Sequence, residues 1–122
     1  MASRGSGAQA KGKAFERELA NFLANKFNVE VRRTPSPERW KTINKGDVNA
    51  RRGTILDDFH WEAKNHATVS VKEWYKKASD DAENRIPVVV FKIPQTSQML
   101  TVVSLEHLTR LLVELQGYRR GE

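Results

Sequence analysis

Three segments of the chain place apolar side chains at the spacing of an amphipathic helix. Residues 13–26 carry four of them on one face, namely Phe15, Leu19, Phe22 and Leu23. Residues 71–84 repeat the pattern, and residues 105–116 carry five leucines after Ser104, a residue type that favours a helix N-cap. The pattern therefore predicts one helix near each end of the chain and one in the middle.

Five segments have the pattern of β-strands. Residues 27–33 alternate in polarity, and residues 47–51 and 55–65 look like two strands joined around Gly53. Residues 87–93 form a continuous apolar run, which is typical of a strand buried on both faces, and residues 99–103 follow a turn. The element order α-β-β-β-α-β-β-α predicts an α/β domain with one mixed sheet flanked by helices.

The rest of the pattern divides the chain into an arm and one domain. Residues 1–12 lack apolar periodicity and are expected to form a flexible basic N-terminal arm. Residues 13–122 are then a single domain, since 122 residues are enough for one core and too few for two. Residues 34–46 are expected to form a long loop, of the kind that is often functional.

Composition excludes several classes of protein. Cysteine is absent, which rules out disulfides, thiolate zinc sites and a cysteine nucleophile. No apolar run reaches the length of about 18 residues that a membrane span needs, and the first residues lack the apolar core of a secretory signal. We therefore expect no membrane association and a location inside the cell, in the cytoplasm.

The charge distribution points to a polyanion. The net charge is +6, and the excess lies in residues 1–52, which hold 12 basic and 5 acidic side chains. This imbalance favours nucleic acid as a partner, although many small intracellular proteins are simply basic. The candidate phosphate contacts are Arg4, Lys11, Lys13, Arg17, Arg32, Arg33, Arg39, Lys41 and Lys45.

Two carboxylates and a lysine form the densest chemical signal. Because side chains alternate along a strand, Glu62 and Lys64 share one face, where they could form a simple ion pair. Asp47 begins the neighbouring strand, so a hairpin would bring it near Glu62. Two close carboxylates repel unless a cation lies between them, and Mg²⁺ or Mn²⁺ prefers such oxygen ligands.

Gly46-Asp47, fourteen residues and then Glu62-Ala63-Lys64 resemble the D-x(n)-E-x-K core of the PD-(D/E)XK nuclease superfamily, with Gly46 in place of proline. The segment from Gly12 to Glu18 resembles the first helix of archaeal-type Holliday junction resolvases. The resemblance implies a restriction-endonuclease-like fold. It also implies a Mg²⁺-dependent endonuclease, with Mn²⁺ as a substitute, that resolves four-way DNA junctions as a homodimer.

The resemblance also implies roles for individual residues. Asp47 and Glu62 would bind the metal with the Ala63 carbonyl, Glu16 would complete the acidic cluster, and Lys64 would orient water or stabilise the transition state. Periodicity alone does not choose Glu16 over Glu18, because the two flank the apolar stripe equally. Further correspondences, each of which also has a plain structural interpretation, are Ser36 for a loop serine and Lys72, Lys76 or Lys77 for a glutamine missing from the second helix.

His60 and Trp40 have two interpretations each. His60 lies on the Glu62 face and could touch substrate or be structural, and Trp40 could stack on a base or anchor its loop.

The expected activity has two alternatives and one consequence. Another PD-(D/E)XK endonuclease of phage or repair type, or a non-catalytic nucleic-acid-binding domain, would carry many of the same features. Two cuts per junction demand two active sites, which predicts a two-fold homodimer. The apolar strand and helix that follow Ile93 are the candidate interface.

Overall fold

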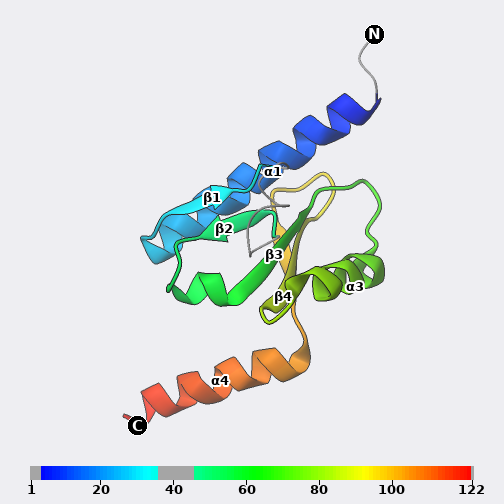
Figure 1. The fold of residues 1–122 in the computed structure, drawn as a ribbon. Helices are drawn as coiled ribbons and strands as arrows, with labels where there is room; N and C mark the ends of the chain where they lie inside the picture. The colour runs from blue at the N-terminus through cyan, green and yellow to red at the C-terminus, as the bar shows by residue number, and fades with distance from the viewer. Residues whose placement is uncertain (1–3, 36–45, 122) are drawn as a thin grey trace.

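The computed structural model describes residues 4–35 and 46–121, which form one five-stranded mixed sheet with helices around it (Figure 1). The strands are β1 (Val31–Arg33), β2 (Val48–Ala50), β3 (Phe59–Lys64), β4 (Ile86–Lys92) and β5 (Met99–Val102), and they lie in that order across the sheet. Only β3 and β4 are parallel neighbours, and the other three pairs are antiparallel. The predicted mixed α/β sheet is confirmed, and it is consistent with a restriction-endonuclease-like fold.

Helices α1 (Arg4–Phe27) and α3 (Val71–Ala82) cover opposite faces of the sheet. Alternate residues of β4 show this directly, because Val88 and Val90 join the α1 core while Val89 packs with Trp74 and Ala78 of α3. Helix α3 is also the crossover that a parallel strand pair requires. The prediction of a strand buried on both faces is confirmed.

Helix α1 begins nine residues before the predicted start, so residues 4–12, which were expected to belong to a flexible arm, are helical in the structure. The prediction depended on apolar periodicity, which these residues lack. Helix propagation does not need an apolar face, because each residue added to an existing helix gains a backbone hydrogen bond. The other end also extends, to Phe27, and Asn28 terminates the helix with a left-handed φ of 52°. The strand predicted over residues 27–33 is therefore reduced to β1.

The strand predicted over residues 55–65 is also shorter. Its first four residues form the 3₁₀ helix η1 (Ile55–Asp58), which follows the turn at Gly53. Adjacent Asp57 and Asp58 disfavour a strand, and the turn lets Leu56 enter the core. The Trp61 indole N–H donates to the Leu56 carbonyl at 3.0 Å and holds η1 against β3.

Helix α4 (Leu105–Arg119) extends away from the sheet (Figure 1). Ser104 caps it as predicted, because the Ser104 hydroxyl accepts from the His107 backbone N–H at 3.2 Å. No residue of α4 is buried, in contrast to α1 and α3. The leucines of α4 therefore do not contribute to the core of this chain.

Candidate active site

A cleft of about 330 Å³ opens where α1, β2 and β3 meet. Glu16 of α1, Asp47 just before β2, and Ala63 and Lys64 at the end of β3 line it, and Lys77 of α3 closes one side. Segments that are far apart in the sequence therefore meet at this cleft, and two of them contribute Asp47 and Lys64 of the D…E-x-K pattern. Lys11, Gly12, Asn65, His66 and Ala67 complete the lining.

Asp47 is held against the edge of β3 by two hydrogen bonds. Its backbone N–H donates to the Trp61 carbonyl at 2.7 Å, and its carboxylate Oδ2 accepts from the Ala63 N–H at 2.7 Å. The antiparallel register, in which Val48 faces Trp61, places Asp47 alongside Glu62. The expected approach of the two strands at this end is therefore present, and the Asp47 side chain is buried there.

Glu62 is almost completely buried and is surrounded by positive or polar groups. Its Oε1 lies 3.0 Å from His60 Nε2, and its Oε2 lies 3.7 Å from Lys64 Nζ and 3.6 Å from Lys77 Nζ. Burial alone would raise the pKa of Glu62, but the His60 hydrogen bond and the Lys77 and Lys64 charges outweigh it and lower the pKa. Glu62 is therefore an ionised carboxylate at neutral pH. Its Oε2 makes no hydrogen bond within the described part of the chain.

Glu16 and Glu18, which periodicity left equivalent, have different surroundings. Glu16 is buried in the cleft and accepts from Arg33 Nε at 3.0 Å. Glu18 is exposed and pairs with Lys92 Nζ at 2.9 Å, outside the cleft. Helix packing on the sheet therefore brings Glu16, the residue that the family resemblance selected, to Asp47 and Lys64. Arg33, one of the expected DNA contacts, forms an ion pair with this carboxylate.

The sequence did not distinguish among Lys72, Lys76 and Lys77 as candidate phosphate contacts. Of these three lysines, Lys77 lines the cleft. Lys72 and Lys76 are exposed on the outer side of α3, where Lys76 pairs with Asp80 at 3.0 Å. Lys77 directly precedes Ala78, a fully buried residue, and so lies at the border of the apolar face. That position at the border is the sequence signal that could have singled it out.

His60, Glu62 and Asp81 bring potential ligand atoms within 4.8 Å of one another. Lys77 Nζ lies 3.6 Å from Glu62 and 3.9 Å from Asp81, so an ammonium already supplies positive charge to these carboxylates. His60 is buried and bonded to Glu62, which favours the structural interpretation of this histidine.

His66 lies at the mouth of the cleft, beside the Trp74 ring at 5.5 Å between centroids. Partial burial and the positive charges of Lys64 and Lys11 lower its pKa below the ordinary value. The imidazole is therefore largely neutral at pH 7 and senses the same lysines that face the carboxylates.

The other predicted DNA contacts are distributed unevenly. Lys11 reaches the cleft, whereas Lys13, Arg17, Arg32 and Lys72 are exposed to solvent. Arg4 belongs to the first turn of α1. The four candidates on the predicted loop, together with Trp40, lie outside the described residues: Ser36, Arg39, Lys41 and Lys45.

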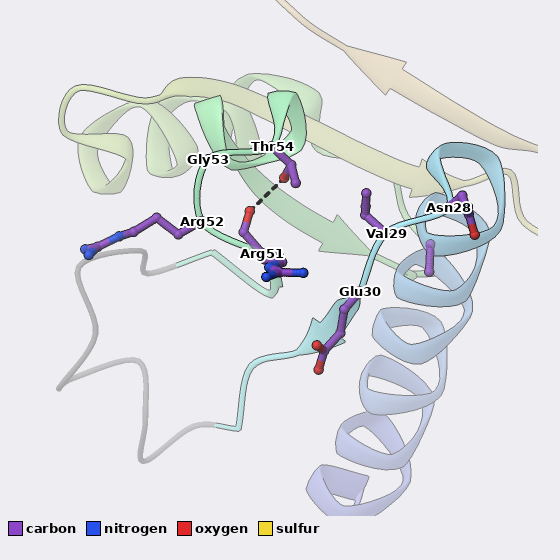
Figure 2. A pocket seen from close by; sticks show the side chains of 8 residues that line it. Asn28, Val29, Glu30, Arg51, Arg52, Gly53 and Thr54 are labelled. Atoms are coloured by element: carbon purple, nitrogen blue, oxygen red, sulfur yellow. Dashed lines mark hydrogen bonds between the residues drawn. The ribbon is translucent and has the colours of Figure 1, made fainter.

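A second hollow of about 550 Å³ lies between the C-terminal end of α1 and the turn after β2 (Figure 2). Glu30 is its single carboxylate, and Arg52 points away from it. The Thr54 hydroxyl donates to the Arg51 carbonyl at 2.7 Å and closes the turn. This hollow lacks the paired carboxylates of the first cleft and offers no comparable chemistry.

Comparisons with known proteins agree with the geometry of the cleft. No curated protein matches the chain. A family model described as "Phage putative PDDEXK endonuclease" matches residues 7–120, which include α1 from Gly7 onward, the whole sheet and the cleft. None of the described helices combines the length and apolar content that a membrane crossing requires. With nearly all of its 122 residues matched, and with an acidic cluster and a lysine at the converging ends of β2 and β3, the chain belongs to this phage PD-(D/E)XK endonuclease family.

Proposed function

We propose that this protein is a Mg²⁺-dependent endonuclease that cuts branched DNA, with the four-way junction as its preferred substrate. The observation that carries the proposal is the cleft in which Glu16, Asp47 and Lys64 meet beside the buried Glu62. Membership of a PD-(D/E)XK endonuclease family supports the nuclease activity. The four-way junction as substrate and Mg²⁺ as metal are the parts that we propose beyond this family membership.

The donor set fits a hard divalent cation. Asp47 and Glu62 are neighbours across the paired ends of β2 and β3 and offer carboxylate oxygens, and the Glu62 Oε2 is buried without a hydrogen bond in the described part of the chain. These two carboxylates, the Ala63 carbonyl and Glu16 would hold Mg²⁺, and Mn²⁺ would substitute because it takes the same ligand types. When bound, such a cation supplies Lewis acidity, which polarises a phosphate and makes nearby water more acidic.

The lysines of the cleft complete the chemistry. Lys64 and Lys77 each lie within 4 Å of the Glu62 carboxylate, and we expect both ammonium groups to act on the scissile phosphate. Fixed positive charge at that point stabilises the additional negative charge of the transition state. Lys64 would also orient the attacking water, and Lys11 would contact the phosphate backbone at the edge of the cleft.

The preference for branched DNA follows from size and charge. One small domain has little surface with which to distinguish base sequences, so recognition must depend on phosphates and DNA shape. A four-way junction has two strands to cut, and each chain has one such cleft among its described residues. The working form would therefore be a homodimer, acting in the cytoplasm of the cell that holds the DNA.

A PD-(D/E)XK endonuclease for flaps or duplex DNA is the second candidate, because the same cleft would serve it. A non-catalytic binding domain is disfavoured by the intact set of Asp47, Glu62 and Lys64.

Incubation with labelled four-way junction, flap, duplex and single-stranded DNA tests the proposal, in Mg²⁺, in Mn²⁺ and in EDTA. The expected result is cutting of the junction in either metal and none in EDTA. Faster cutting of flap or duplex DNA than of the junction would favour the second candidate, an endonuclease for flaps or duplex DNA. Cutting in EDTA would overturn the metal site.

A further inference from the structure

Helix α4 exposes a row of leucines that no other part of the described chain covers. Leu105 is 73%, Leu108 40%, Leu112 52% and Leu115 46% exposed, whereas α1 buries Leu19 and Leu23 and α3 buries Trp74 and Ala78. The helix extends from the body into solvent (Figure 1). A helix of 15 residues is only marginally stable in water without tertiary packing, so this face needs a partner.

The spacing of the row indicates what kind of partner fits. The four leucines follow one another at intervals of three, four and three residues, which is the spacing of a two-stranded helical seam. The positions that flank this seam are uncharged, namely Thr109, Leu111 and Gln116. The charged residues Glu106, Arg110 and Glu114 lie on the opposite side of the helix.

We propose that α4 pairs with α4 of a second copy of this chain, in antiparallel orientation, through these four leucines. The inference rests on the homodimer of the proposed function and specifies its interface. An antiparallel pair centred between Leu108 and Leu112 forms leucine layers throughout, because Leu105 then faces Leu115 of the other copy. A parallel pair would instead bring Arg119, which continues the same row, against its own copy, and the two guanidinium groups would repel.

Sedimentation equilibrium of the full chain, without DNA or metal, tests the interface. The wild-type protein is expected to give about twice 13.9 kDa at micromolar concentration, and L112E is expected to give the monomer mass. V113E is the matched control: it adds the same charge at the next residue, which is 67% exposed and lies about 100° around the helix from Leu112. A monomeric wild type, or a dimer that L112E leaves intact, would overturn the proposal.

The absence of cysteine allows the orientation to be tested by disulfide formation. Oxidation of a mixture of L105C and L115C chains is expected to give the mixed dimer. L105C alone is expected to stay unlinked, because ten residues separate the two positions, or about 15 Å along the helices. Circular dichroism checks that each exposed substitution leaves the fold intact. Efficient self-linking of L105C would show a parallel pair and overturn the antiparallel arrangement.

The two proposals can fail separately. A dimer that depends on the leucines but does not cut junctions would support the proposed interface and show that the proposed substrate is wrong. A monomeric protein that still cuts DNA in Mg²⁺ would show that the proposed interface is wrong and would support the proposed nuclease activity.

Discussion

Glu62 is the most buried acidic residue in the described part of the chain, and its surroundings determine its charge. Two ammonium groups and the His60 hydrogen bond keep the carboxylate ionised despite burial. Asp47 and Glu16 are likewise held by hydrogen bonds that orient them within the cleft. The three carboxylates are therefore held in place by other groups of the chain, which is what electrostatic stabilisation without a reorganisation cost would require of an active site.

We expect Asp47→Asn and Glu62→Gln to lower junction cleavage by roughly a thousandfold or more. Each removes a metal ligand, and metal-supplied stabilisation of several kcal/mol corresponds to that factor. Binding of junction DNA, measured in EDTA, should remain, since neutralising an acidic cleft reduces repulsion of phosphate. Glu18→Gln outside the cleft is the control. Cleavage by either cleft variant at the wild-type rate would show the site assignment to be wrong.

Lys77→Met should reduce cleavage on the order of a hundredfold, because one of the two fixed positive charges beside Glu62 is lost. Lys76→Met removes the same charge from the exposed side of α3 and should leave the rate close to that of the wild type. Single-turnover kinetics in Mg²⁺ measures both. Equal effects of the two substitutions would exclude a role for Lys77 that depends on its position.

The pKa of His66 depends on the nearby charges of Lys64 and Lys11, so it tests the positions of these lysines without any DNA. Removal of positive charge should favour imidazolium, so Lys64→Met and Lys11→Met should each raise the pKa of His66 toward its ordinary value. Proton NMR of the His66 ring across pH 4 to 8 measures this directly. Lys26→Met, at the far end of α1, is the control. An unchanged midpoint in both cleft variants would contradict the described position of the imidazole.

At the scale of elements, the cleft exists because helices from both faces of the sheet reach the same edge. Helix α1 lies over β1 to β3 and supplies Glu16 and Lys11, while α3 lies over β3 and β4 and supplies Lys77. The converging ends of β2 and β3 lie between them. The N-terminal part of α1 continues beyond the sheet (Figure 1), and Lys11 on this part of the helix lines the cleft.

The position of Lys11 predicts a specific salt dependence. If its ammonium contacts a phosphate, Lys11→Ala should lower the slope of log affinity against log salt by roughly 0.9. Lys26→Ala in the last turn of α1 removes the same charge at the other end and should not change the slope. Fluorescence anisotropy with a labelled junction between 50 and 200 mM salt measures both. Identical slopes for wild type and Lys11→Ala would exclude this contact.

At the scale of the whole molecule, the described part of each chain presents the cleft of Glu16, Asp47 and Lys64 and the uncovered apolar face of α4. A two-fold pair of chains would cover the helix and supply the second cleft. The two features therefore lead to the same assembly, one from the need for burial and the other from the symmetry of the substrate.

A plasmid that extrudes a four-way junction tests this coupling. Wild-type dimers should make paired cuts and release linear DNA. An equal mixture of wild-type and Asp47→Asn chains forms about half mixed dimers if the subunits exchange freely, and these should leave nicked circles. Gel electrophoresis separates the two products. A strict monomer that still gives linear DNA in a single encounter would contradict the two-fold assembly.

The sequence by itself determined the features that depend on local periodicity. Alternation along residues 59–64 placed Glu62 and Lys64 on one face, and the expected pairing of two neighbouring strands brought Asp47 near Glu62. The order of helices and strands, the doubly buried β4 and the Ser104 cap follow from the same local signals. These features are local because backbone geometry repeats every two or 3.6 residues.

Tertiary structure alone decided the rest. Glu16 and Glu18 are equivalent on a helical wheel, and only the direction in which α1 packs on the sheet brings Glu16 into the cleft. Lys77 enters the cleft in the same way, through the packing of α3 on β3 and β4. That α4 finds no covering surface among the described residues of its own chain is also a property of the assembled fold. Each of these facts depends on contacts between distant segments, which periodicity does not encode.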